Sequence, residues 1–132
     1  MNTTWQPIEI SSFPTSEYRC ESIRGITVVK VSIVSSSNRI TGVTQALELI
    51  DPEVAIPDKP VMVKPNFVTT SNQLAATHVD ATRATLDYLS GKGVSQFLIA
   101  VGPAIGTPDS GFENYGYREL SNDFKIEFMD LN

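Results

Sequence analysis

The apolar run from Val61 to Val68 constrains the fold of this chain more than any other stretch. It is nearly continuous in apolar character, which is typical of a strand buried on both faces of a parallel sheet. Pro65 cannot donate a hydrogen bond to a neighbouring strand, so we expect regular pairing to end close to Lys64. Ligands bind outside the carboxyl ends of the strands in open parallel sheets, so this run also predicts where a crevice lies.

Three other stretches are also predicted to be strands. They lie at residues 26–34, 94–101 and 124–131. The first alternates apolar residues with Lys30 and Ser32, which suits a strand near the edge of a sheet. The second contains a buried core run, and the last alternates only weakly.

Helices are predicted between the strands. Residues 42–50 have apolar side chains at helical spacing, and Thr41 is placed to cap their start. A second helix runs from Thr77 to about Ser90, and Thr77 and Asp80 have the spacing of a capping box. Both helices therefore carry a polar start signal before an apolar stripe.

The third helix is predicted to start at Ser110, which has capping-box spacing with Glu113. Strands and helices thus alternate along the chain, and this order is typical of an α/β fold. We expect a three-layer arrangement, with a mainly parallel four-stranded sheet and helices on its faces. No covering helix follows the last strand, so we expect an incomplete domain from a longer chain.

Two segments fall outside this regular pattern. Residues 1–24 are broken by prolines and polar pairs and form an N-terminal arm before the α/β domain of residues 25–132. The arm either packs on the body through Trp5 and nearby apolar residues or is a loosely attached leader. Residues 51–60 hold three prolines and are expected to be a connector.

Composition excludes several classes of function. The formal net charge of −5 and the scattered basic residues disfavour a nucleic-acid partner or an anionic membrane surface. No apolar stretch is long enough to span a membrane, and the N-terminus lacks a secretory signal, so we expect a cytoplasmic protein. Cys20 is the only cysteine, so this chain cannot hold an iron–sulfur cluster or a Cys-based zinc site by itself.

Lys64 and Asn66 are the first site candidates, because they follow a buried run at the expected crevice. A lysine there can hold a carboxylate or phosphate, or act as a base if it is desolvated. The alternative for Lys64 is a rim lysine whose ammonium extends into solvent. Asn66 either binds a ligand or caps the turn after Pro65.

His78, the only histidine, lies in the first turn of the second predicted helix, beside Thr77. Free N–H groups at a helix start favour a neutral imidazole, which is an acid–base group or a metal ligand. His78 with Asp80 and Asp130 is a weak candidate for a metal site. The alternative is a histidine that only packs at the surface.

The glycine loop that follows the third strand supplies Gly102 and Gly106. Glycines let a backbone approach a ligand closely, although this loop matches neither a P-loop nor a dinucleotide-binding motif. A tight strand-to-helix turn is the alternative. Asp130, at the end of the last strand, either balances Lys64 across the crevice or is a rim carboxylate.

Several short motifs together resemble the domain-of-unknown-function 362 family over roughly residues 26–132. In order, they are Val63-Lys64-Pro65-Asn66-Phe67-Val68, Ala76-Thr77-His78, Gly102-Pro103, Phe112 through Gly116-Tyr117 to Leu120, and Met129-Asp130-Leu131-Asn132. The Lys-Pro-Asn and Asp-Leu-Asn motifs, in this order and spacing, are specific when taken together.

The resemblance implies a setting rather than a reaction. The family has no settled reaction, and its members are mostly bacterial and archaeal. Many carry ferredoxin-type cysteine motifs that hold iron–sulfur clusters, which this chain lacks. Family domains continue beyond the Asp-Leu-Asn motif, so the resemblance implies an N-terminal half. It carries five positions over as site candidates, without roles: Lys64, Asn66, Thr77, His78 and Asp130.

Two classes of function follow. The first is an enzyme, or half of one, that binds a small anionic molecule, with or without a metal, at the carboxyl edge of the sheet. The second is a non-catalytic scaffold or redox-partner module whose function lies in a missing C-terminal portion. In the second case an exposed apolar patch and an oligomer are expected. The sequence identifies no cofactor.

Overall fold

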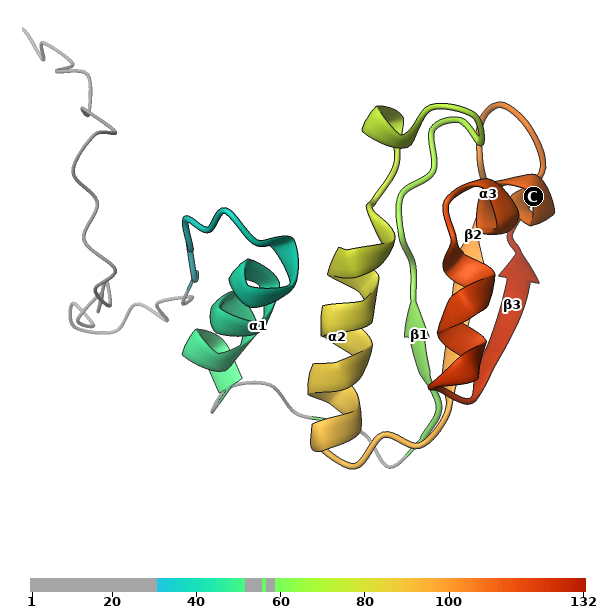
Figure 1. Cartoon of the computed structure of the whole chain (residues 1–132). Helices are drawn as coiled ribbons and strands as arrows, with labels where there is room; N and C mark the ends of the chain where they lie inside the picture. Colours follow the sequence, from blue (N-terminus) through green and yellow to red (C-terminus); the bar gives the residue numbers. More distant parts are fainter. Residues whose placement is uncertain (1–30, 52–55, 57–58) are drawn as a thin grey trace, which may run out of the picture.

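A parallel sheet organises the part of the chain that the structure, a computed structural model, describes: residues 31–51, 56 and 59–132. Its three strands are β1 (Val61–Val63), β2 (Phe97–Val101) and β3 (Ile126–Asp130), in the order β1-β2-β3 (Figure 1). Both strand pairs are parallel. The predicted α/β class with a parallel sheet is therefore confirmed.

The fourth expected strand, at residues 26–34, is not part of this sheet. Residues 26–30 lie outside the described residues, and residues 31–34 belong to no strand. Val31 and Ile33 are 73% and 89% exposed. Alternation gives a segment strand propensity, but a strand also needs a neighbour to pair with its backbone. Among the described residues the sheet has three strands, not four.

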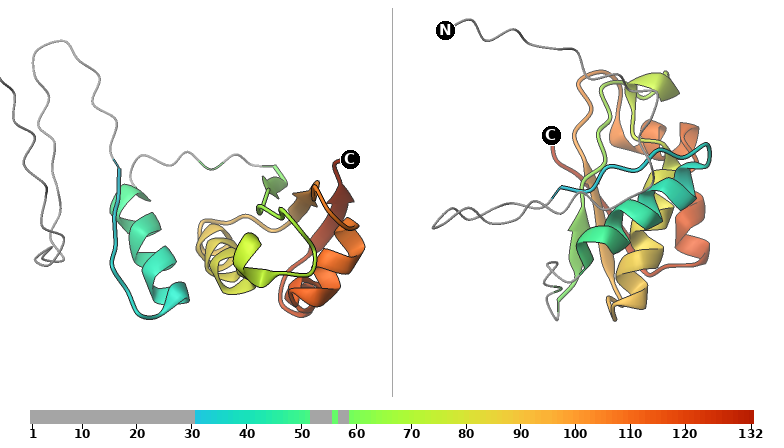
Figure 2. Two further views of the ribbon diagram at one scale, coloured as in Figure 1. Left: turned by 90° about the horizontal axis from the view of Figure 1, so that it is seen from above. Right: turned by 90° about the vertical axis from the view of Figure 1, so that its left-hand side faces the viewer.

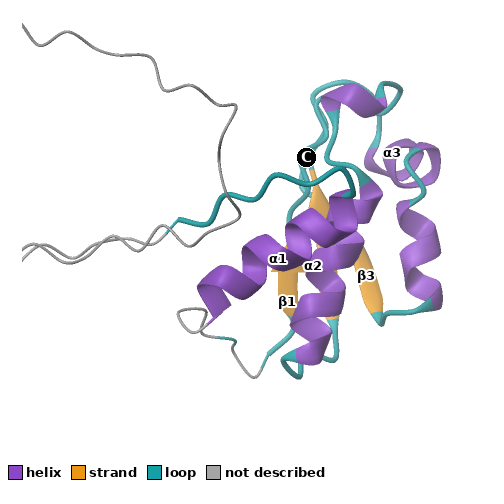
Figure 3. Cartoon of the chain, turned by 60° about the vertical axis from the view of Figure 1, so that its left-hand side comes forward, coloured by secondary structure: helices purple, strands orange, loops and turns teal. Residues whose placement is uncertain are grey.

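The α-helices of the described part are α1 (Arg39–Ile50), α2 (Val79–Gly91) and α3 (Pro108–Asn114). Helices α2 and α3 lie on one face of the sheet, and α1 lies beside α2 rather than on the sheet (Figures 2 and 3). Consecutive crossovers of one hand that move in one direction across a sheet place their helices on the same side. The described part thus has two layers rather than the expected three. We call the face away from α2 and α3 the outer face.

The prediction that β1 is buried on both faces is wrong. Val61 and Val63 pack against the core, whereas Met62 between them is 53% exposed. The physical reason is the position of the strand: among the described strands β1 is at the edge of the sheet, with helices against one face only. An apolar run cannot distinguish a covered face from an open one, because the cover comes from elsewhere in the chain.

The start of α2 differs from its predicted cap. Thr77 and Asp80 do not form a capping box; instead His78 is the N-cap, and its Nδ1 accepts a hydrogen bond from the Asp80 N–H at 3.2 Å. The hydroxyl of Thr77 is already used, because it accepts from the Asn66 N–H at 3.0 Å. The next polar side chain therefore takes over the cap.

The other two helices, unlike α2, begin earlier than predicted. Asn38, not Thr41, caps α1, and its side chain accepts from the Thr41 N–H at 2.9 Å. Asparagine ranks above threonine as an N-cap. Thr107 and Ser110 form the capping box of α3, because Pro108 is suited to the first helical position. The predicted pairing of Ser110 with Glu113 is therefore replaced by this box.

The core lies between the sheet and the helices α2 and α3. Phe67 is at its centre and makes edge-to-face contacts with three rings, at centroid distances of 5.0 to 5.9 Å. Those rings are Phe112, Tyr115 and Tyr117. Two 3-10 helices, Gln73–Ala75 and Tyr117–Asn122, complete the described elements. The aromatic cluster fixes the end of β1 against α3.

Two expectations concern segments that are not described. The N-terminal arm of residues 1–24, with Cys20, lies outside the described residues, as does most of the connector at residues 51–60. Among the helices that are described, none has both the length and the apolar character needed to cross a membrane.

Candidate functional site

The carboxyl ends of the three strands lie along one edge of the sheet, as their parallel order predicts (Figure 1). Val63 pairs with Ile99 and Val101 pairs with Asp130. Lys64 and Gly102, which directly follow β1 and β2, therefore share an edge with Asp130. This edge is where open parallel sheets bind ligands.

Lys64 and Asn66 project from the outer face. Burial alternates along the chain here: Pro65 and Phe67 are buried, while the residues on either side of them are exposed. Phe67 packs in the core on the helix side, so the alternate positions point to the opposite face. Met62, Lys64, Asn66 and Val68 form this exposed column. In the described part, no carboxylate lies within 4.0 Å of the Lys64 ammonium.

Asn66 and Thr77 are joined by two hydrogen bonds, one between their backbones and one to the Thr77 side chain. The Asn66 N–H donates to the Thr77 hydroxyl at 3.0 Å, and the Thr77 N–H donates to the Asn66 carbonyl at 2.8 Å. The Thr77 carbonyl accepts a third bond, from the Tyr117 hydroxyl at 2.9 Å. The N–H, the carbonyl and the hydroxyl of Thr77 thus each take part in one hydrogen bond within the chain, which ties the segment of Asn66 to the start of α2. The structure thus brings Lys64, Asn66, Thr77 and His78 into one neighbourhood.

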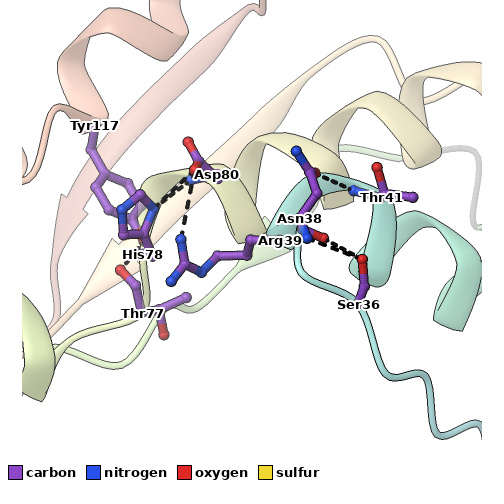
Figure 4. Close-up of polar contacts among 8 residues, drawn as sticks. All are labelled: Ser36, Asn38, Arg39, Thr41, Thr77, His78, Asp80 and Tyr117. Atoms are coloured by element: carbon purple, nitrogen blue, oxygen red, sulfur yellow. Dashed lines mark hydrogen bonds and ion pairs between the residues drawn. The ribbon is translucent and has the colours of Figure 1, made fainter.

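Tyr117 was not among the residues predicted for the site. Its hydroxyl donates to the Thr77 carbonyl (Figure 4). The same hydroxyl lies 3.0 Å from the Thr82 hydroxyl, and the side chain is buried. Burial raises the pKa of Tyr117 to about 12, so the hydroxyl is a permanent donor at neutral pH. The Gly116-Tyr117 pair within the family-like motifs was the available signal for it.

His78 lies in a small charged cluster at the start of α2 (Figure 4). Its Nδ1 accepts from the Asp80 N–H and lies 3.4 Å from the Asp80 carboxylate, which in turn is 3.7 Å from the Arg39 guanidinium. An Nδ1 that accepts a hydrogen bond is unprotonated, which assigns the proton to Nε2. The neutral ring can therefore donate from Nε2 to a ligand.

His78, Asp80 and Asp130, the weak candidates for a metal site, do not come together in the described part. His78 and Asp80 are adjacent, but no group of three or more His, Cys, Asp or Glu side chains forms a candidate metal site among the described residues. Asp130 belongs to β3, and its carboxylate accepts from the Asn132 N–H at 2.8 Å. Alternation along β3 places Asp130 on the helix side, with Phe128, so it does not balance Lys64.

The glycine loop serves packing. Gly106 has φ +94°, and a Cβ there would lie 2.0 Å from the hydroxyl oxygen of Thr70. The Ile105 N–H donates to the Val68 carbonyl at 3.2 Å, so the loop is paired with the segment after β1. A Cβ at Gly102 would lie 2.9 Å from the side-chain oxygen of Asn132. These glycines therefore allow close contact between parts of the chain, which is the tight-turn alternative.

An open hollow lies away from this edge, between α1 and α2. Its volume is about 500 Å³, and its lining residues are Thr44, Glu48, Asp51, Asp87, Tyr88, Gly91 and Lys92. The Asp51 carboxylate accepts from Lys92 at 2.6 Å and from the Tyr88 hydroxyl. The hydrogen bond from Lys92, then that from Tyr88, lowers the pKa of Asp51. These groups satisfy one another and join the two helices.

One comparison with known proteins gives a match. Residues 61–132, more than half of the chain, match the model of a family described as "Domain of unknown function (DUF362)". The match begins at the first residue of β1 and includes all three strands. No curated protein and no solved structure matches the chain.

Proposed function

The chain belongs to the DUF362 family, whose description assigns no activity, and from that premise we propose that the carboxyl edge of its sheet binds a small anionic molecule through Lys64. Lys64 lies at the end of β1 inside the matched segment. Its ammonium is the group that attracts the anion.

The exposure of Lys64 without a nearby carboxylate in the described part is the observation that supports this proposal. Lys125 is likewise exposed and without a nearby carboxylate in the described part, but it lies at the amino end of β3, whereas Lys64 follows the carboxyl end of β1. Pro65 and Phe67 are buried and hold the backbone of this segment in place. A fixed backbone lowers the entropy lost when a ligand orders the lysine side chain.

Neighbouring groups supply the rest of the proposed site. The side-chain amide of Asn66 follows Lys64 on the same exposed column and donates to the anion. His78, the residue after Thr77, is the proposed acid–base group, because its Nδ1 accepts a hydrogen bond from the Asp80 N–H and leaves Nε2 to carry the ring proton. With these roles the chain is an enzyme or half of one. Identifying the anion that binds would identify the reaction.

Anion binding is tested by two-dimensional NMR titration with inorganic phosphate and, separately, citrate. We expect shifts at the backbone amides of Lys64 and Asn66, and loss of these shifts in Lys64→Ala with an unchanged melting temperature. Lys125→Ala is the matched control, since it removes an exposed lysine just before β3, at the other end of the sheet. Equal binding by Lys64→Ala, or its unfolding, contradicts the proposal.

A second function, a non-catalytic scaffold or redox-partner module, is favoured by a different observation. Met62, Met129 and Leu131 are large apolar side chains exposed on or beside the sheet. An exposed apolar surface on a parallel sheet indicates a docking surface. Binding of a hydrophobic dye to the native chain supports this function, and its absence argues against it.

A further inference from the structure

The outer face carries a regular set of side chains. The register places Met62, Leu98 and Glu127 in one row across the three strands, and Ala100 and Met129 in the next row. Alternation assigns all five to the face opposite the core, because Val61, Ile99 and Phe128 and their like pack on the helix side. Lys64 follows Met62 by two residues and extends the second row at the β1 edge.

This face is mostly apolar and lacks a cover within the described part. Met62 and Met129 on the outer strands are exposed, whereas on the central strand Leu98 is partly exposed and Ala100 is fully buried; the described helices lie on the other side (Figure 2). Parallel sheets are normally covered on both faces, because their strands leave apolar side chains on each. The face is therefore suited to packing against a second apolar surface.

Lys64 and Glu127 are arranged to complement a copy of the face, and Lys125, two residues before Glu127, adds a further charge at the amino end of β3. Lys64 follows β1 and Glu127 lies on β3, the two edge strands of the described sheet. Neither has an ion-pair partner among the described residues. A two-fold axis parallel to the strands and above β2 places β1 of one copy over β3 of the other. Lys64 then faces β3 of the second copy within one row of Glu127, a step of about 6.6 Å.

We propose that the outer face binds a second copy of this chain, with the sheets face to face and two symmetric Lys64–Glu127 pairs. Met62, Leu98 and Met129 form the apolar centre between the pairs. The inference deepens the second function proposed above and rests on the same exposed face. A three-stranded face is small, so the dimer belongs to the weak, transient class below about 1,200 Å².

Sedimentation equilibrium over a range of protein concentrations measures the dimer. We expect wild type to associate reversibly, and Lys64→Glu and Glu127→Lys each to raise the dissociation constant about tenfold or more by placing like charges together. Mixing these two variants is the decisive experiment, because each copy then supplies the charge that the other needs. The mixture should form a heterodimer about as tight as wild type.

General charge repulsion gives a different result. Glu127→Lys makes this acidic chain less negative, so a purely general effect would strengthen self-association, whereas the proposed pair requires that it weaken. Glu119→Lys is the matched control, since Glu119 is exposed on the 3-10 helix that packs with α3, away from the outer face. It should leave the dimer unchanged.

Failure of this inference is separate from failure of anion binding. Phosphate titration of the Glu127→Lys variant tests anion binding in a monomer that keeps Lys64. A wild type that stays monomeric at all concentrations overturns the dimer. Oxidation of Met62 and Met129 by peroxide then shows what replaces it: protected methionines indicate a cover from the same chain, and reactive ones a face left for another partner.

Discussion

Helix α1 and the body formed by residues 61–132 are held in different ways. In the body, seven large side chains are fully buried, including Phe97, Phe112 and Tyr117. No residue of α1 is buried, although the helix packs alongside α2. Its apolar residues Val43, Leu47 and Ile50 are only partly buried, and polar contacts hold its two ends, through Asp51 at one end and Arg39 at the other.

This difference separates two sources of stability. Burial of apolar area contributes at every pH and salt concentration, whereas exposed ion pairs contribute little and are screened by salt. The family match covers the body and not α1, so the common part of the family coincides with the apolar part of the structure. Four substitutions, from the largest expected effect to the smallest, test the comparison.

Phe67→Ala should have the largest effect. It removes the ring that contacts three other aromatic rings in the core and leaves a cavity, which costs about 3–5 kcal/mol of unfolding free energy. Leu49→Ala in α1 is the control, because Leu49 is largely exposed and its loss should cost less than about 0.5 kcal/mol. Urea denaturation measures both. Equal losses would end the distinction between the two regions.

Gly106→Ala should rank second. Its Cβ would meet the Thr70 hydroxyl at 2.0 Å, and the residue would also be held at φ +94°, so we expect a loss of about 2–3 kcal/mol. Gly93→Ala is a close control, since Gly93 has φ +97° but no atom within 4 Å of the added methyl group. Thermal unfolding of the pair separates the collision from the backbone strain. A loss no greater than that of Gly93→Ala would show that the loop yields.

Tyr117→Phe should come third. It removes the bonds to Thr82 and Thr77 and should cost about 1–2 kcal/mol at neutral pH. Burial raises the pKa of Tyr117 to about 12, so the wild type loses stability as the pH rises from about 10 toward 12, where only the unfolded tyrosine ionises. The difference between the two proteins should therefore shrink by about 1 kcal/mol at about pH 11. Urea unfolding at both pH values checks this, and a constant difference would refute the assignment.

Asp51→Asn should have the smallest effect on global unfolding. It weakens the contacts with Lys92 and Tyr88, so hydrogen exchange should speed up in α1 while the body keeps its protection. Because these contacts lower the pKa of Asp51, the same loosening should appear in the wild type as the pH falls below about 4. Asp87→Asn, in the same hollow, is the control. Faster exchange throughout the body would show that α1 supports it.

The sequence predicted the parts of this fold that depend on local patterns. Apolar runs separated by helix-patterned segments predicted the strands within 94–101 and 124–131. The same order predicted the edge that Lys64, Gly102 and Asp130 share. The prediction that β1 is buried on both faces was wrong, because the sequence of a strand does not say which of its faces other elements will cover. The prediction of a strand at residues 26–34 failed over its described part, residues 31–34, for a related reason, because a strand needs a neighbour with which to pair.

The details of the candidate site depend on contacts between distant residues. The cap of α2 moved to His78 because Asn66, eleven positions before Thr77, uses the threonine hydroxyl. Tyr117 reaches Thr77 across forty positions. No local spacing predicts either contact, so the sequence identified the neighbourhood of the site and not the bonds that hold it. The roles of Lys64, Asn66 and His78 in binding stay predictions.

The two hydrogen bonds between Asn66 and Thr77 have a practical consequence for labelling this protein. They hold together the two ends of the loop formed by residues 67–76. The Val68 N–H, which donates to the Ala75 carbonyl at 3.0 Å, adds a further bond between the two sides of this loop. Leu74, near its tip, is 97% exposed. A short peptide tag inserted beside Leu74 should therefore leave β1 and α2 in place. Attached to a sensor chip through this tag, the protein would have a known orientation relative to the chip, fixed at the carboxyl edge of the sheet.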